Sequence, residues 1–407
     1  MAISRRKFIR SSIAAAAATS IQPFSLSATT NSPVVSKISD DRFDPWIEVD
    51  PTALLHNISE VRRLTKGRPI LAVIKNNAYG LGLSLAAKIL ERLPEIHGFA
   101  VVKLEAAIVL REAGIKKPIH LMARFPQSAA KDIANQNIQP SIIDEDALEF
   151  INPMAKIFGG SVPAQVYLDT GMSRMGISYR RAMPLLKKIA NNGKVSFQGV
   201  FMGFTEEPDF DKEQLKRFLS IVNKSNKAGI QLGTLHAASS SAVFDFPDAH
   251  LDMVRPGMAL YGGYPNDPEK QSQLGTLKST INFKARVVRV EKLRKGDSVS
   301  YGRNYIADKP TWVATVPVGH TDGFPRKAVE GAKVLIGNKT YPVIGAVSAS
   351  HSIVEVGNKK SVQVGDIVTL IGSGAPEVNP NWISAKTGAS VYDLFMHLNP
   401  SLPRVLI

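Results

Sequence analysis

The sequence contains no cysteine, and this absence excludes several kinds of chemistry at once. Without thiols the chain forms no disulfide, no thiolate metal site and no cysteine nucleophile. Its eight histidines are scattered, and no two have the H-x-x-x-H spacing, so we expect no metal site. No internal stretch is apolar over a length that could span a bilayer, so we expect no stable membrane insertion.

The chain also lacks a concentrated block of lysine and arginine, although its formal net charge is +15. Basic residues that are spread along a chain form a solvated surface rather than a groove for nucleic acid, so we expect no nucleic-acid partner. The 407 residues are 44% hydrophobic and 21% charged, which is typical of a globular protein with room for two domains.

The N-terminus differs from the rest of the chain. It reads SRRKFIR, then a mildly apolar SSIAAAAATSIQPF, then the small residues of SLSATT. A basic start, an apolar centre and a small-residue end predict an export signal over residues 1–28. The adjacent Arg5 and Arg6 indicate the twin-arginine type, and the alternative is a disordered basic tail. We therefore expect a periplasmic protein.

Beyond this signal, short apolar runs alternate with longer segments in which apolar residues recur three and four apart. Eight strand–helix alternations of this kind predict a (β/α)8 TIM barrel, and no G-x-G-x-x-G opens a helix as in a doubly wound sheet. The eight runs are PILAVI, GFAVV, PIHLM, QPSII, PAQVYLD, VSFQGVFM, GTLHAA and DMVRPGM.

The pattern changes after about residue 276, where β-rich segments are separated by Gly, Asn and Asp turns. Examples are INFKARVVRVEKL and AKVLIGNKTYPVIGAV. We predict a barrel over residues 46–275 and an all-β domain over 276–407. The segment WIEVD at 46–50 precedes the barrel, and it is a candidate strand of the β domain's sheet.

The apolar run ILAVIKNNAYG ends on Lys75. Active sites of TIM barrels lie at the C-terminal ends of the strands, and a partly desolvated lysine there has a lowered pKa. Such an amine is suited to a Schiff base with a carbonyl cofactor such as pyridoxal 5'-phosphate. The alternative is a lysine whose stem is buried while its charged head reaches solvent.

Two further stretches follow the seventh and eighth runs, where barrels often bind phosphate. HAASSSA contributes Ser239 and Ser240, and VRPGMALYG contributes backbone N–H groups near Gly257 and Met258. Small and hydroxyl residues are also common in ordinary turns.

Three other side chains stand out because each needs a polar partner. Arg255, between apolar residues and Pro-Gly, would suit a pyridine nitrogen or a carboxylate. Arg174 lies between two glycines in LDTGMSRMG, which could aim its guanidinium into the barrel mouth. The hydroxyl of Tyr79 could reach a bound phosphate if the NNAYG turn curls back.

Taken together, AVIKNNAYGLG, DTGMSRMG, VRPGMALYG and SYGRNY resemble, in this order, the motifs of the alanine racemase family. The resemblance covers nearly the whole chain after about residue 46. It implies a pyridoxal-phosphate isomerase with a barrel and a C-terminal β domain, acting on a small amino-acid substrate. It also implies a homodimer whose active site is shared between subunits.

The resemblance assigns roles to matching positions. Lys75 would be the Schiff-base lysine and one catalytic base, and Tyr301 would be the opposite base, reaching in from a second subunit. Arg255 would hydrogen-bond the pyridine nitrogen, and Arg174 would contact the cofactor phenolate and the substrate carboxylate. The remaining cofactor contacts would be Tyr79, Ser240, Gly257, Met258 and Tyr392 at the phosphate, with His236 in the polar network behind the ring.

The chain departs from the family pattern at four positions. Gly203 stands where a histidine would link the arginine to the catalytic tyrosine. His320 stands where a pocket tyrosine is usual, and Ala349 and Ser350 stand where Met-Asp is usual. We therefore expect a more open substrate pocket, lined by His320 and Ala349, that accepts side chains larger than that of alanine. An export signal also fits the broad-specificity periplasmic relatives.

Two rival functions use the same lysine. A lyase or decarboxylase on this barrel is disfavoured by Tyr301, by Arg255 at the pyridine position and by the lack of cysteine. A pyridoxal-phosphate binding protein without catalysis is supported by Gly203 and Ser350, but that class usually lacks the β domain. We therefore predict an amino-acid racemase that interconverts L- and D-amino acids by two-base proton transfer.

Overall fold

A computed structural model of the chain describes residues 34–35 and 41–407. The export signal predicted over 1–28 lies outside these residues. In the part of the chain that the structure describes, no helix has both the length and the apolar character that crossing a membrane requires.

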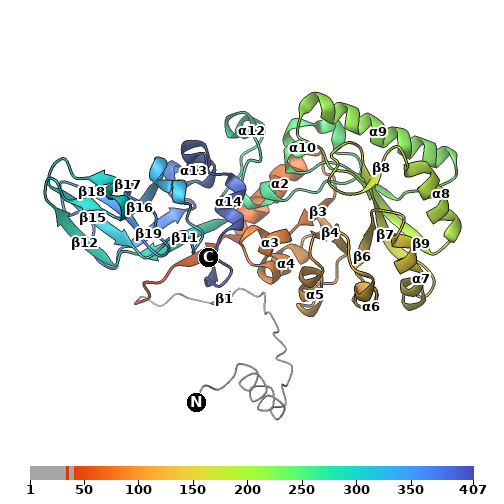
Figure 1. Cartoon of the computed structure of the whole chain (residues 1–407), viewed down its shortest axis with the longest axis horizontal. Helices are drawn as coiled ribbons and strands as arrows, with labels where there is room; N and C mark the ends of the chain where they lie inside the picture. Colours follow the sequence, from red (N-terminus) through yellow and green to blue (C-terminus); the bar gives the residue numbers. More distant parts are fainter. Residues whose placement is uncertain (1–33, 36–40) are drawn as a thin grey trace, which may run out of the picture. The chain divides into compact units, whose positions relative to one another are not determined.

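A parallel sheet forms the barrel (Figure 1). Apart from β8 (Ile177–Ser178), which pairs with the end of β7, its strands lie side by side in sequence order. They are β3 (Ile70–Val73), β4 (Ile96–Val101), β5 (Ile119–Leu121), β6 (Gln139–Ile142), β7 (Val162–Asp169), β9 (Val195–Phe201) and β10 (Thr234–His236). All four residues of β3 are buried, as expected for a strand covered on both faces.

The eighth apolar run closes the barrel by hydrogen bonds to the strands on both sides of it. Leu71 N donates to Val254 O at 2.9 Å on the β3 side, and Arg255 N donates to Ala238 O at 2.8 Å just after β10. The run is short because Pro256 has no N–H to donate. The (β/α)8 class predicted from the sequence is confirmed.

Helices follow the barrel strands and lie outside them in Figure 1. The two longest begin at a side-chain cap: the side chain of Asp50 accepts from Thr52 N and Ala53 N at the start of α2, and Glu207 accepts from Phe210 N at the start of α9. The helices are α2 (Pro51–Leu64), α4 (Leu83–Glu91), α5 (Leu104–Glu112), α6 (Ala130–Asn135), α7 (Ala147–Ile157), α8 (Ala182–Asn192), α9 (Pro208–Lys227), α10 (Ser240–Asp245), α11 (Met258–Tyr261) and α12 (Pro268–Leu274).

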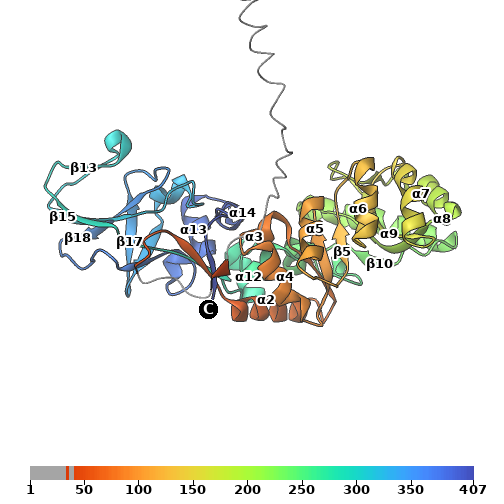
Figure 2. The same cartoon turned by 90° about the horizontal axis from the view of Figure 1, so that it is seen from below.

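The C-terminal part is built on a ten-stranded sheet (Figure 2). In spatial order its strands are β1 (Val34–Val35), β20 (Arg404–Leu406), β2 (Trp46–Val49), β11 (Ile281–Arg286), β19 (Ile367–Ile371), β16 (Lys333–Ile336), β17 (Lys339–Ile344), β18 (Ser352–Gly357), β15 (Thr311–Val316) and β12 (Arg289–Leu293). The WIEV segment is thus a strand of this sheet and pairs with β11 and β20. The short strands β13 (Ser298–Val299) and β14 (Tyr305–Ile306) form a separate pair, and the helices are α13 (Pro380–Thr387) and α14 (Val391–Met396).

One buried arginine joins the end of the chain to the turn that follows β3. Arg404 is fully buried and donates from Nη2 to Gly80 O at 2.9 Å. Burial lowers its pKa to about 10. A Cβ atom at Gly80 would lie 2.3 Å from Phe395 O in α14, so only glycine allows this approach. The turn that carries Lys75 is therefore held from its C-terminal end.

Candidate active site

Lys75 begins a short left-handed turn at the C-terminal end of β3. The turn is α3 (Lys75–Tyr79), and φ is +52° at Asn76, +56° at Asn77, +49° at Ala78 and +53° at Tyr79. A left-handed conformation costs roughly 1–2 kcal/mol per residue for alanine or tyrosine, and such strain gathers at functional sites. The side chain of Asn77 accepts from Leu83 N at 2.8 Å and braces the turn.

The amine of Lys75 lies in an environment that favours its neutral form. The side chain is half-buried, and the pKa of Lys75 is lowered by desolvation and, to a smaller extent, by the charge of Arg174. A lysine with a lowered pKa is a usable base or nucleophile near neutral pH, whereas an exposed one is not. The structure thus places Lys75 where a barrel enzyme needs a reactive amine.

The residues predicted to hold a phosphate lie together next to this turn. Ser240 Oγ accepts from Gly257 N at 2.9 Å and from Ala259 N at 3.2 Å, which joins the starts of α10 and α11. Tyr79 is buried, and its ring stacks on that of Tyr261 with the ring centroids 4.7 Å apart. A Cβ atom at Gly257 would lie 2.1 Å from Tyr79 Oη. Glycine at 257 therefore makes room for the tyrosine hydroxyl.

Met258 and Tyr392 complete this group. Met258 is buried at the start of α11, and Tyr392 lies on α14 close enough to Tyr79 to act on its pKa electrostatically. Burial, together with the nearby charge of Glu206, raises the pKa of Tyr392 to about 12. Its hydroxyl therefore stays protonated at neutral pH and can donate a hydrogen bond to an anion.

A chain of hydrogen bonds crosses the barrel interior from Arg255, which follows the residue that pairs with β3, to Gln165 on β7. Arg255 Nη1 donates to His236 Nδ1 at 3.0 Å, and His236 Nε2 lies 2.7 Å from Gln165 Oε1. This pairing assigns the imidazole proton to Nε2. Burial lowers the pKa of Arg255 to about 10 and that of His236 far below its usual value, so at neutral pH the arginine is charged and the histidine neutral.

Gln165 was not among the residues predicted from the sequence. Its one signal was a single polar residue within the apolar run PAQVYLD, which is also common in ordinary strands. Glu206 was missed for a similar reason, because it lies in the acidic loop TEEPD that resembles a helix cap. Glu206 is exposed, but partial desolvation and the nearby charges of Asp211 and Asp245 raise its pKa, and Arg174 opposes them.

Arg174 lies on the loop after β7, and its side chain is exposed. The loop is held by Asp169, whose Oδ1 accepts from Gly171 N and from Ser173 N, each at 3.0 Å. The guanidinium is close enough to Lys75 and Glu206 to act on the pKa of both. The structure therefore brings Arg174 to the same end of the barrel as Lys75.

The remaining predicted residues form a second group on loops of the β domain. Tyr301 lies in the 3-10 turn η3 (Tyr301–Arg303) between β13 and β14, and 77% of its surface is exposed. The preceding Ser300 donates from Oγ to Ala346 O at 3.1 Å, in the loop that leads to Ala349. Within one chain, Tyr301 thus faces solvent rather than packing against Lys75.

His320 and Ala349 belong to this second group. His320 N donates to Ser348 O at 2.9 Å, and Ala349 O accepts from Thr321 N at 3.1 Å, which ties the two loops together. Ala349 and the neighbouring Ser350 are exposed. The predicted site is therefore divided into two half-sites: a barrel half around Lys75 and a β-domain half around Tyr301.

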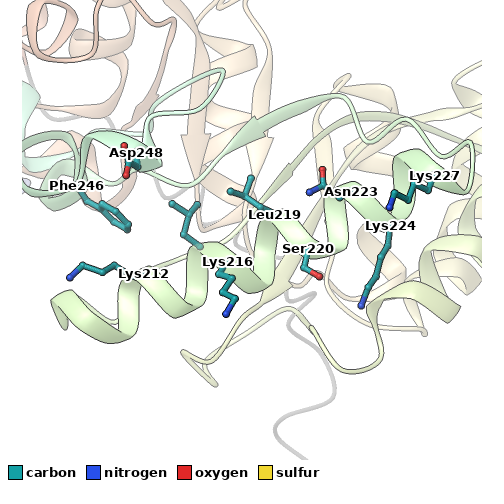
Figure 3. A pocket seen from close by; sticks show the side chains of 10 residues that line it. Lys212, Lys216, Leu219, Ser220, Asn223, Lys224, Lys227, Phe246 and Asp248 are labelled. Carbon is teal, nitrogen blue, oxygen red and sulfur yellow. The ribbon is translucent and has the colours of Figure 1, made fainter.

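A groove of about 600 Å³ lies elsewhere, along the outer face of α9 (Figure 3). Lys212, Lys216, Lys224 and Lys227 line it, with Phe246 and Asp248 nearby. None of its lining residues belongs to either half-site, so the groove is not the substrate pocket. Among the described residues, no group of three His, Asp or Glu is placed to hold a metal ion.

Comparison with known sequences supports the same assignment. The family model "Alanine racemase, N-terminal domain" matches residues 49–265, and "Alanine racemase, C-terminal domain" matches 280–406. The alanine racemase of Clostridium tetani is 30% identical over 370 residues, which cover 89% of this chain and 95% of that protein. The alanine racemase of Treponema denticola is 33% identical over 366 residues, which cover 87% and 96%.

Solved structures agree with the sequences. Alanine racemase from Clostridium difficile 630 superposes with a TM-score of 0.82 at 28% identity and covers 91% of this chain and 97% of its own. The Bacillus anthracis alanine racemase with bound L-Ala-P gives 0.79 at 26% identity, with 91% and 96% covered. The chain belongs to the alanine racemase family, whose members are pyridoxal 5'-phosphate dependent.

The barrel half-site fits this cofactor on its own geometry. It offers an amine with a lowered pKa for the aldehyde, and a cradle of hydroxyl groups around Gly257, where any Cβ would meet Tyr79. It also offers a buried, charged guanidinium for the ring nitrogen. The donor set therefore matches the aldehyde, the phosphate and the pyridine of one molecule.

Proposed function

We propose that this protein is a pyridoxal-phosphate-dependent racemase of amino acids, in which Lys75 and Tyr301 move protons on opposite faces of the α carbon. The observation that carries the proposal is the half-buried Lys75 at the C-terminal end of β3, whose pKa is lowered by desolvation and by the charge of Arg174. The family's racemases supply the reaction type.

The cofactor, when bound, acidifies the substrate Cα–H by delocalising the charge left on that carbon. Arg255 would hold the ring nitrogen by donating a hydrogen bond while keeping its own proton. It would leave that nitrogen unprotonated, which weakens charge withdrawal into the ring and favours return of the proton to Cα. Tyr79, Ser240 and Tyr392 would hold the phosphate, together with the backbone around Gly257 and Met258.

Inversion needs one group on each face of the α carbon. Free lysine and tyrosine have pKa values near 10, so a lowered pKa brings Lys75 closer to the range in which it can accept a proton at neutral pH. Tyr301 would donate or accept the proton on the other face. Arg174 would hold the substrate carboxylate through its forked N–H groups.

The experiment that tests the function uses purified holoprotein. Incubating it with each L- and D-amino acid in turn should give the opposite enantiomer, detected by chiral chromatography. Release of carbon dioxide or ammonia without inversion would instead indicate a decarboxylase or lyase. Cofactor absorbance with no turnover of any amino acid would indicate a binding protein.

The active site is proposed to be shared in a homodimer, because Tyr301, the residue assigned as the opposite base, is exposed on one chain and lies outside the barrel half-site. Mixing inactive Lys75→Ala chains with inactive Tyr301→Phe chains should therefore restore activity. Random pairing yields mixed dimers in half of the molecules, each with one intact site of two, so about a quarter of wild-type activity is expected. Activity that stays near zero after subunit exchange, verified with differently tagged chains, would argue against a shared site.

The substrate range is proposed to extend beyond alanine, because His320, Ala349 and Ser350 replace bulkier or charged residues of the family pattern. Each methylene that a pocket can bury is worth about 0.8 kcal/mol, or roughly fourfold in kcat/KM. We expect serine, methionine, lysine and arginine to be racemised within about tenfold of alanine, and Ala349→Met to slow methionine and lysine about tenfold more than alanine.

The matched control for the pocket is Val364→Met, which places the same methionine side chain at an exposed position of the same domain. It should leave the kcat/KM of each amino acid relative to that of alanine unchanged. If alanine is preferred by orders of magnitude and Ala349→Met changes nothing, neighbouring loops refill the space and the pocket is not open.

Export to the periplasm is proposed from the N-terminal motif, which lies outside the described residues. The twin-arginine route carries folded cargo, so the cofactor is best captured in the cytoplasm. Arg5→Lys combined with Arg6→Lys should leave active holoprotein in the cytoplasm, whereas Arg10→Lys in the same segment should not. Cell fractionation followed by a racemase assay measures this, and unchanged periplasmic activity would refute the route.

A further inference from the structure

The space beside Gly203 is occupied by side chains from two other segments. A Cβ atom at Gly203 would lie 3.4 Å from Tyr167 Oη, 3.4 Å from Met172 Sδ and 3.8 Å from Arg174 Nη2. The hydroxyl of Tyr167 and the guanidinium of Arg174 thus converge on the same point. We propose that Tyr167 is a positioning residue for Arg174, and that the small Gly203 leaves beside the tyrosine hydroxyl a space that a side chain much larger than a methyl group would fill.

The ring of Tyr167 is held firmly. Tyr167 lies near the C-terminal end of β7, is 6% exposed, and stacks on Phe201 with ring centroids 4.4 Å apart. Phe201 in turn stacks on His236 at 5.3 Å, and the guanidinium of Arg255 lies 5.2 Å from the Phe201 ring. A ring packed in this way has little freedom, so its hydroxyl has a defined position at the barrel mouth.

Arg174 needs such a neighbour because its own side chain is exposed. The contacts of Asp169 hold the backbone of the loop at Gly171 and Ser173, but they leave the arginine rotamers free. A long side chain loses about 2 kcal/mol of rotamer entropy when it is ordered on a ligand. The hydroxyl of Tyr167, which borders the same space as the guanidinium, limits the rotamers open to Arg174 before the substrate arrives.

Strand β7 carries residues that contact the surroundings of both Arg255 and Arg174. Gln165 and Tyr167 are two residues apart on β7 and so face the same side of the sheet, and Gln165 accepts from the His236 that supports Arg255. Tyr167 is also close enough to Arg255 to act on its pKa electrostatically. One strand therefore supports both the arginine assigned to the ring nitrogen and the arginine assigned to the substrate carboxylate.

This inference rests on the proposed function for the role of Arg174. Tyr167→Phe keeps the ring and removes only the hydroxyl, so it should raise KM for alanine about tenfold and leave kcat within about twofold. The matched control is Tyr179→Phe, which removes a hydroxyl from a tyrosine whose ring packs on Arg180 and Arg217. It should change neither constant. An equal fall in kcat and kcat/KM in Tyr167→Phe, or no change, would overturn the proposal.

Binding of propionate separates this inference from the racemase assignment, because propionate has the carboxylate of alanine and no amine to react. Calorimetry on the holoprotein should show propionate binding about tenfold more weakly in Tyr167→Phe than in wild type. If no amino acid is racemised but this difference is found, the proposed function fails and the positioning role stands. Equal affinity in the two proteins would overturn the positioning role.

A second pair of variants tests the shared space. Gly203→His places an imidazole where the Tyr167 hydroxyl and Arg174 converge, so alone it should raise KM at least as much as Tyr167→Phe. Combining the two changes removes the clash and lets the imidazole contact Arg174, so the double variant should bind alanine better than Gly203→His alone. Additive losses would show that Tyr167 and Gly203 do not share this space.

Discussion

Replacing Lys75 by alanine should lower kcat/KM for racemisation by about ten-thousandfold or more, because the change removes both the attachment point for the cofactor and one of the two bases. The turn around it should remain folded, since Asn77 and Gly80 hold the backbone through contacts that do not involve the lysine side chain. The loss should therefore appear in activity and not in the thermal melting temperature of the apoprotein.

Covalent labelling identifies the same residue independently. Borohydride reduction of the holoprotein, followed by proteolysis and mass spectrometry, should leave the cofactor on the peptide that contains Lys75. Lys103→Ala is the matched control, because Lys103 follows the next barrel strand, β4, but is exposed. It should keep full activity and the same labelled peptide. A label on any other peptide would contradict the assignment of Lys75.

Replacing Tyr301 by phenylalanine should slow inversion by about a hundredfold to ten-thousandfold, the usual contribution of a positioned acid or base. Cofactor binding should change little, since Tyr301 lies outside the barrel half-site. In deuterated water, the variant should still exchange the α proton of the enantiomer whose proton faces Lys75. Exchange from the other enantiomer should be lost, and nuclear magnetic resonance of the recovered amino acid can measure both.

Tyr305→Phe is the matched control for this prediction, because Tyr305 lies on β14 of the same small two-stranded sheet. It should leave exchange in both enantiomers unchanged. Equal and mild effects of Tyr301→Phe on both enantiomers would show that this tyrosine is only a wall of the pocket.

The periodicity of the sequence was enough to predict the barrel and the position of its reactive lysine. Apolar runs of strand length alternate with helical spacing because each strand is buried on both faces and each helix on one. A lysine directly after such a run lies at the strand's C-terminal end wherever the strand is placed in the barrel. Lys75 could therefore be placed without knowing any of its neighbours.

The conformation of the turn after Lys75 was not predictable in the same way. Asparagine tolerates positive φ, but Ala78 and Tyr79 have no local preference for it. Their strain is offset by tertiary contacts: Tyr79 packs on Tyr261, and Arg404 binds Gly80 from the far end of the chain. The sequence near residue 75 contains none of these partners.

By itself, the sequence determined the two kinds of architecture, the end of the barrel that carries the chemistry, and most of the side chains in each half-site. Only the tertiary structure decided how these side chains are supported: Gln165 behind His236, Tyr167 beside Gly203, and Tyr301 exposed to solvent rather than packed on Lys75. The physical reason is the separation along the chain between the residues that interact. Helix and strand patterns reflect energies within a few residues, whereas a hydrogen-bonded or stacked pair depends on which distant strands the closed barrel brings together.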